Sequence, residues 1–298
     1  MTPLALFINP VGRLRSGWRY TFYVCAFLAT YFFVAPLVGD RFRLTLLAVA
    51  TLLGWVCGRL FEDLPSRALG WGLHRGWLRD LLLGSALGVL SLALAAGIGW
   101  VAGGLRFEFA GWGVMSLRHI ASAAIVFTLA AAAEEAVCRG YQLQTLMRSW
   151  PFWLAVLPSS AFFASGHLLN PNVSVLGVLN TFLAGIWLAV GYHRTRSLWL
   201  PLGLHWAWNW ATASLLGLPV SGVVRHSGNS AWIATDVGPA WLTGGAYGVE
   251  GGVACTVALI LSTLFIWKTP VLTADAELKA FTDAEVPARE KSGDVQTV

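Results

Sequence analysis

The sequence predicts an all-α polytopic membrane protein, a bundle of about eight transmembrane helices. The composition is the first indication, because 56% of the residues are apolar and only 12% are charged, whereas a soluble domain has roughly 25% charged residues. The second is that apolar runs approaching the roughly 20 residues needed to cross a bilayer recur along the chain. Only short polar breaks separate these runs, so residues 1–268 are predicted to form one transmembrane domain.

The apolar runs also predict where each helix crosses the membrane, to within about 2–4 residues. The predicted spans are residues 20–38, 44–61, 80–103, 119–147, 152–169, 175–193, 198–217 and 251–267. The N-terminal residues are too weakly apolar to form a removable signal peptide. The first span is therefore expected to stay as an anchor.

Basic residues are divided unequally between the two sides of the predicted bundle. If the N-terminus is cytoplasmic, the external segments keep only Arg41, Arg43, Arg106, Arg118 and Arg225. This asymmetry follows the positive-inside rule and predicts that both termini are cytoplasmic; in a bacterium the membrane would be the cytoplasmic membrane. The net charge of +5 does not indicate nucleic-acid binding, because the basic residues lie at helix ends and not in one patch.

Two segments fall outside the predicted spans. Residues 217–252 are rich in glycine and predict an external loop, either a plain connector or a lid that folds back over the helices. Residues 269–298 combine mixed charge with low apolarity. They predict a disordered cytoplasmic tail.

Two adjacent acids, Glu134 and Glu135, lie within a run of alanine and valine and are the only carboxylates deep in a predicted span. A charge at the bilayer centre costs at least ~2.5–3.5 kcal/mol on insertion scales, so such residues mark functional positions with a partner nearby. Arg139 follows Glu135 by four residues, the order that favours an ion pair on one helix face. Glu134 points about 100° away and has no such partner in its own segment.

Two further spans carry isolated polar residues at helical spacing. Phe163 and His167 are four residues apart near the end of the fifth span. His205 and Asn209 are four residues apart in the seventh. Counted at 1.5 Å per residue from the cytoplasmic side, Glu134, His167 and His205 lie at depths of about 20, 22 and 10 Å. Because helices tilt by about 20°, these depths are compatible with one site near the middle of the membrane.

These three motifs resemble those of the CPBP (CAAX protease and bacteriocin-processing) intramembrane endopeptidases, which include the type II CAAX prenyl proteases. That family is marked by EExxxR, FxxxH and HxxxN/B on successive membrane helices. All three stand in this order within a core of about residues 80–215: Glu134-Glu135-Ala136-Val137-Cys138-Arg139, Phe163-Ala164-Ser165-Gly166-His167 and His205-Trp206-Ala207-Trp208-Asn209. Cys138 stands where the family commonly has phenylalanine, which we interpret as a change in packing.

The resemblance implies an intramembrane endopeptidase, and the residue chemistry fits peptide hydrolysis. That reaction needs a base, an oriented water molecule and donors for the developing oxyanion. Glu134 is expected to act as the general base, and His167 to hold and polarise the water. His205 and Asn209 are expected to donate hydrogen bonds to the oxyanion.

The remaining motif residues are expected to support the site. Glu135 and Arg139 would brace it as an ion pair, and Phe163 would shape the pocket around the neighbouring histidine. No cofactor is expected, since an asparagine amide is a poor zinc ligand and the chain has no HExxH helix. A divalent metal such as zinc stays open as an alternative. Its ligands would be Glu134, His167 and His205.

The expected substrate is a membrane-anchored or membrane-inserting protein or peptide, prenylated or not, that reaches the enzyme through the lipid bilayer. Two other functions would use the same buried acids. A proton-coupled transporter would usually show inverted repeats and broken helices. A non-catalytic membrane partner of the immunity type would use the polar residues only to hold helices together. The unpaired Glu134 favours the enzyme.

Overall fold

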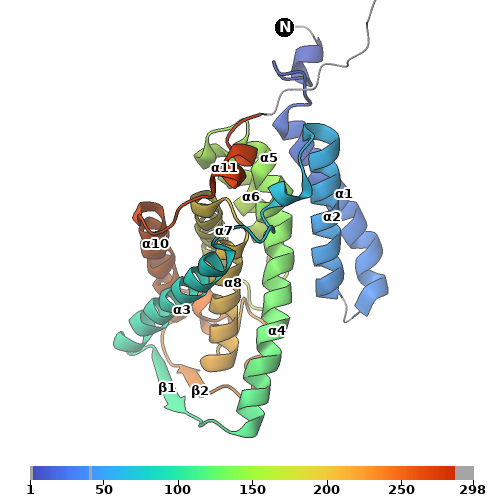
Figure 1. Ribbon diagram of the computed structural model, residues 1–298. Coiled ribbons are helices and arrows are strands. Elements are labelled where there is room, and N and C mark those ends of the chain that lie inside the picture. Colours follow the sequence, from blue (N-terminus) through green and yellow to red (C-terminus); the bar gives the residue numbers. More distant parts are fainter. Residues whose placement is uncertain (1–2, 40–41, 286–298) are drawn as a thin grey trace, which may run out of the picture.

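Figure 1 shows the computed structural model, a helical bundle built around one central helix. It describes residues 3–39 and 42–285. The central helix α8 (Trp199–Trp210) packs against α3 (Trp77–Val101), α4 (Val114–Val137) and α7 (Val175–Thr195). Since α8 contains the HxxxN motif and α4 the two adjacent acids, this packing brings both motifs into the core.

The other long helices pack around this centre. Helices α1 (Ser16–Val38) and α2 (Phe42–Glu62) pair with each other beside α4. Helix α6 (Phe152–Ser165) packs on α7, and α10 (Val253–Lys268) packs on α3 and α7. Helix α11, near the end of the described chain, lies at the same end of the bundle as the N-terminal segment (Figure 1).

Short helical elements and turns complete the fold. They are η1 (Pro3–Leu6), η3 (Ser66–Leu69), η4 (Cys138–Gln142), α5 (Leu143–Met147), η5 (Ala211–Leu215), α9 (Ala240–Thr243), η6 (Gly245–Tyr247), η7 (Val249–Gly251) and α11 (Ala276–Thr282). The elements η4 and η5 are π-helical turns that continue α4 and α8.

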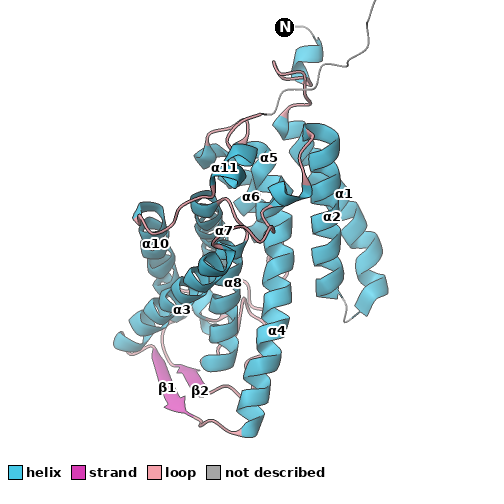
Figure 2. Cartoon of the chain, in the orientation of Figure 1, coloured by secondary structure: helices cyan, strands magenta, loops and turns pink. Residues whose placement is uncertain are grey.

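Helices dominate the described chain, as Figure 2 shows, and the prediction of an all-α polytopic membrane protein is confirmed. Five helical stretches are long and apolar enough to cross a membrane by length and composition. They are Ser16–Val38, Arg43–Glu62, Trp77–Val101, Val114–Met147 and Val175–Thr195.

The remaining three predicted spans correspond to shorter helices. Helices α6 and α10 have 14 and 16 residues, and α8 has 12 before its π-helical turn, below the roughly 20 that a straight crossing needs. The predicted span 152–169 was too long, because α6 ends at Ser165 and turns follow. Pro171 disfavours a helical conformation for the residue before it, so the helix does not resume there.

The structure also contains a small antiparallel sheet that the sequence did not predict. Strand β1 (Leu105–Phe109) follows α3 and pairs with β2 (Trp232–Asp236), with Leu105 opposite Asp236 and Phe109 opposite Trp232. Figure 2 shows both strands at the end of the bundle away from the N-terminus. Since β2 belongs to the segment 217–252, the sheet fastens that segment to the end of α3.

The tail is folded as far as Glu285, which corrects the prediction of disorder for residues 269–298; residues 286–298 lie outside the described residues. Asp275 caps α11 by accepting from the backbone N–H groups of Glu277 and Leu278. Leu278 is buried against the bundle. Three apolar or ionic anchors therefore outweigh the low overall apolarity of the tail: the buried Leu278, the ion pair of Arg196 with Asp283, and the contact of Arg19 with Glu285.

Glycines at the contact between α3 and α8 set the position of the central helix. A Cβ atom on Gly84 would come within 2.2 Å of the carbonyl oxygen of Leu200, and one on Gly203 within 2.4 Å of that of Leu81. The two backbones therefore touch, as in the small-residue interfaces typical of membrane helices. This contact holds α8 at one depth relative to α3.

Candidate active site

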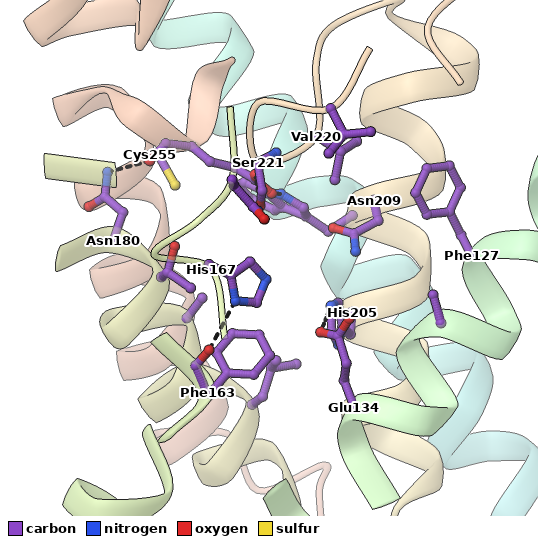
Figure 3. Close-up of a pocket in the computed structure, with 18 of the residues that line it drawn as sticks. Phe127, Glu134, Phe163, His167, Asn180, His205, Asn209, Val220, Ser221 and Cys255 are labelled. Atoms are coloured by element: carbon purple, nitrogen blue, oxygen red, sulfur yellow. Dashed lines mark hydrogen bonds and ion pairs between the residues drawn. The ribbon is translucent and has the colours of Figure 1, made fainter. Parts of the chain in front are cut away.

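One cavity of about 190 Å³ between α4, α6, α7 and α8 is lined by five of the motif residues: Glu134, Phe163, His167, His205 and Asn209. Figure 3 shows Glu134, His205 and Asn209 along one side and Phe163 and His167 along the other. The predicted convergence of these groups on one pocket is thus present in the geometry.

The two adjacent glutamates have different surroundings. Glu134 faces the cavity with 36% of its side chain exposed, whereas Glu135 is fully buried. The cause is the helical rotation of about 100° per residue, which turns neighbouring side chains toward different partners. Among the described residues the Oε2 atoms of both acids are enclosed and have no hydrogen-bond partner. Only Glu134 lines the cavity and is partly exposed, so it is the acid that a ligand or water can reach.

His205 lies between the two acids. Its Nδ1 is 2.8 Å from Oε1 of Glu135, and its Nε2 is 3.7 Å from Oε2 of Glu134. A carboxylate accepts and does not donate, so Nδ1 carries the proton in the shorter contact. The sequence had paired Glu135 with Arg139 alone, and the structure adds this second partner on α8.

Arg139 forms the predicted pair with Glu135, at 3.2 Å. Its guanidinium also donates to the carbonyl oxygen of Gly185 on α7 and stacks over the Phe163 ring, 4.5 Å from the ring centre. Both charged side chains are fully buried. A buried pair of this kind depends on matched charges and hydrogen bonds, and α6, α7 and α8 supply further partners. In the part of the chain that the structure describes, Oε2 of Glu135 and Nε of Arg139 have no hydrogen-bond partner.

A kink separates the two acids from the end of their helix. The π-helical turn η4 bends at Gly140, whose ψ of −133° lies outside the helical range. The carbonyl oxygens of the turn find partners nearby: Ser159 donates to that of Cys138, and Gln144 to that of Arg139. Such π-turns often occur at functional sites, and this one allows Arg139 to turn inward toward α7.

His167 lies in the turn just after α6, one residue beyond Gly166. Its Nδ1 is 2.9 Å from the carbonyl oxygen of Phe163, which can only accept, so Nδ1 is the donor. In the neutral ring the other nitrogen, Nε2, is then an acceptor. The Phe163 ring packs against both His167 and His205, with centres 4.9 and 5.7 Å apart. The Phe163 ring therefore contacts both histidines.

The comparisons with known proteins agree with these motifs. Residues 116–211 match the family model described as Rce1-like, type II CAAX prenyl endopeptidase. The match covers the three motifs and supports the predicted resemblance to the CPBP family. It also supports a protease of the CAAX type. No curated protein and no solved structure matches the chain.

The wall of the cavity extends beyond the region 116–211 that the family model matches. Ser221, Val223, His226 and Glu250 from the segment 217–252 line it, together with Arg43 from α2. The segment therefore folds back over the helices, one of its two predicted alternatives. Glycine content gave the only sequence signal for it, and nothing in the pattern indicated which of its polar side chains face the site.

The donors that face the cavity bear on whether it could hold a metal. In the described ranges 3–39 and 42–285, no group of three or more His, Cys, Asp and Glu side chains is arranged to hold a metal ion. The motif residues supply a partly exposed carboxylate, two imidazoles and a neutral amide, and the segment 217–252 adds Glu250 and His226. This set suits acid–base chemistry and hydrogen bonding to an oxyanion.

Proposed function

We propose that this protein is an intramembrane endopeptidase that hydrolyses a peptide bond with a water molecule activated by Glu134. The main support for this proposal is the contrast between the two acids. Glu135 is buried with two partners, whereas Glu134 is open to a cavity lined by His167, His205 and Asn209. An acid kept free within apolar helices has a chemical use more readily than a structural one.

Glu134 acts as the general base. Its Oε2 stands 3.7 Å from Nε2 of His205, too far for a direct hydrogen bond. Oε2 itself is enclosed, so the water binds to the part of the carboxylate that is open to the cavity. Nε2 of His167 accepts a hydrogen bond from one O–H of this water, and Glu134 removes the other proton as the oxygen attacks the peptide carbonyl. Glu134 then gives that proton to the peptide nitrogen as the C–N bond breaks, which releases the amine and the carboxylic acid products.

His205 and Asn209 stabilise the oxyanion. They lie one helical turn apart on α8 and both line the cavity. Because Nδ1 of His205 already donates to Glu135, a donor role for Nε2 requires the doubly protonated ring. Two carboxylates and one arginine leave a net negative charge in this cluster, and the imidazolium balances it. Glu135 therefore both orients His205 and favours its charged form.

The mechanism is proposed as independent of metal. The neutral Asn209 amide is a poor ligand for zinc, and hydrogen bonding to an oxyanion is a natural use for it. The alternative metal set of Glu134, His167 and His205 would engage the same cavity-facing atoms that the proposed mechanism uses for the water and the oxyanion.

The substrate is proposed to be a membrane-anchored or membrane-inserting protein or peptide. The family match names a CAAX prenyl endopeptidase, so a prenylated C-terminal sequence is one candidate to test. We propose that the protein sits in the cytoplasmic membrane with both described ends of the chain on the cytoplasmic side. Clustering of basic residues toward that side supports this orientation.

Native membranes contain the natural substrate and therefore test the proposal before that substrate is identified. Membrane proteins are compared between cells that carry the wild-type protein and cells that carry Glu134→Gln at equal abundance. The variant should accumulate an uncleaved precursor and lack the matching new terminus. Equal processing in both strains would overturn the proposal.

A further inference from the structure

A second carboxylate on the cavity wall links the segment 217–252 to the central helix. Oε2 of Glu250 accepts hydrogen bonds from both the backbone N–H and the hydroxyl of Ser221, the latter at 2.6 Å. Oε1 of the same carboxylate accepts from Nε1 of Trp208 at 2.9 Å. Trp208 precedes Asn209 on α8, so Glu250 ties Ser221 to the helix that carries the proposed oxyanion donors.

Ser221 is held in a conformation that serine rarely adopts. Its φ is +46°, in the left-handed region. Residues other than glycine persist there only where their surroundings determine the backbone, and they cluster at functional sites. The next residue, Gly222, is pressed so closely against the turn after His167 that a Cβ atom would lie 1.9 Å from the Pro171 carbonyl oxygen. The backbone at Ser221 is therefore fixed relative to His167.

The segment is fixed on its other side as well. The Asn180 amide on α7 donates to the backbone carbonyl oxygens of Glu250 and Gly252, at 2.8 and 2.9 Å. The Asn180 carbonyl in turn accepts from the Thr256 hydroxyl. Glu250 is thus anchored by both its backbone and its side chain, and the cavity wall that it forms with Ser221 is rigid.

A peptide in this cavity would present both carbonyl and N–H groups. His205 and Asn209 serve the carbonyl at the scissile bond, but a desolvated N–H also needs an acceptor, because an unpaired buried donor is costly. The Ser221 hydroxyl donates its proton to Glu250, and its oxygen keeps two lone pairs. The neighbouring Tyr247 hydroxyl can use one of them, which leaves the other for a substrate N–H. Figure 3 shows Ser221 across the cavity from Glu134, on the far side of His167.

We infer that the Ser221 hydroxyl is a substrate-binding group that accepts a backbone N–H from the peptide substrate, and that Glu250 is the residue that positions it. The inference rests on the proposed peptidase function. It adds a contact outside the matched region 116–211, from a loop that otherwise serves only as a cover.

Steady-state kinetics on the full-length protein in lipid vesicles test this contact, with a farnesylated peptide that ends in a CAAX sequence as the probe. Ser221→Gly removes the hydroxyl, keeps the backbone N–H for Glu250, and relieves the positive φ. Ser221→Ala removes the hydroxyl and keeps the Cβ. Both should raise KM by about 3–10-fold, the range expected for one hydrogen bond, and change kcat by less than about twofold.

Two more variants separate binding from loop structure. Ser227→Ala removes another hydroxyl of the same segment, one that donates to the Leu218 carbonyl and does not line the cavity, and should leave KM unchanged. Glu250→Gln should raise KM as the serine variants do, and should also speed hydrogen exchange of the amides around Ser221. In Ser221→Gly that exchange should stay slow.

Unchanged KM in both serine variants would overturn the inference while the peptidase function stands. A loss confined to kcat would overturn it equally. If the wild-type protein does not cleave the probe, binding of the same peptide to Glu134→Gln and to Glu134→Gln/Ser221→Gly is compared. Weaker binding in the double variant supports the contact, and equal binding or none overturns it.

Discussion

The Nδ1 atom of His205 lies 2.8 Å from Oε1 of Glu135, so the buried acid of the pair reaches across from α4 to the central helix. Arg139 approaches the same oxygen at 3.2 Å from its own helix. Glu135 is therefore the junction of a local ion pair and an interhelical hydrogen bond. This arrangement orients His205 so that its other nitrogen faces Glu134 and the cavity.

The first prediction concerns this junction. Glu135→Gln should destabilise the fold by about 3–5 kcal/mol, because it leaves the buried Arg139 without its counter-charge. Thermal unfolding in detergent and the yield of folded protein measure the effect. Glu134→Gln is the matched control, since it changes the adjacent, cavity-facing acid, and should unfold at the wild-type temperature. Equal stability of both variants would contradict the structural role of Glu135.

The second prediction concerns the oxyanion. Asn209→Ala should lower kcat by about 10²–10³-fold with little change in KM, the loss typical of one oxyanion donor. The reason is that the contact strengthens only as charge develops on the carbonyl oxygen. Kinetics with the farnesylated peptide provide the measurement. A raised KM with normal kcat would assign Asn209 to substrate binding instead.

A third prediction tests the close approach of α3 and α8. Gly84→Ala should destabilise the protein markedly and reduce activity, since its methyl group would meet the Leu200 carbonyl oxygen at 2.2 Å and push α8 outward. Gly97→Ala makes the same change in the same helix where no atom lies within 4 Å. That control should be neutral or slightly stabilising, because alanine favours helix over glycine by about 1 kcal/mol. Similar unfolding temperatures for the two variants would argue against the tight contact.

A fourth prediction concerns the docked tail. Arg194 on α7 donates to three backbone carbonyl oxygens, those of Trp267, Thr269 and Leu272, at 2.6–2.8 Å. Arg194→Ala should free residues 269–285 and cost about 1–3 kcal/mol, because the carbonyls lose their donors. Hydrogen exchange and limited proteolysis of the tail detect its release. Lys279→Ala removes only a largely exposed contact with Asp283 and should leave the tail protected.

The fifth prediction is that activity survives metal removal. Full chelation with EDTA followed by 1,10-phenanthroline should leave kcat unchanged, since the proposed base, water-holding group and oxyanion donors are all side chains. Loss of activity that added zinc restores would instead favour a site formed by Glu134, His167 and His205.

The motif residues were predictable because their chemistry is costly in lipid. Acids within an apolar run need a function or a partner, and the spacing of Glu135 and Arg139 places a partner on the same helix face. The spacing of Phe163 with His167, and of His205 with Asn209, predicted two further groups of site residues. His167 lies in the turn just after α6, one residue beyond the C-cap. The resemblance to the CPBP family followed from these patterns, and the match over residues 116–211 supports it.

Contacts between distant segments were not predictable in the same way. The bond from His205 to Glu135 depends on the relative depth of two helices, which the glycine contact of α3 with α8 sets and which hydropathy cannot resolve. The docked tail depends on donors such as Arg194 meeting backbone carbonyls, for which no local sequence signal exists. The contacts of the segment 217–252 were also not predictable. Ser221 and Glu250 resemble ordinary loop residues in the sequence, and only the fold brings them to the cavity.

Cleavage of a farnesylated CAAX peptide by the purified protein in lipid vesicles, followed by mass spectrometry, tests the central claim most directly. The wild-type protein should release a defined fragment, and Glu134→Gln, inserted and folded to the same extent, should be slower by at least about 10²-fold, as expected for loss of a general base. Turnover by Glu134→Gln at the wild-type rate would contradict the account.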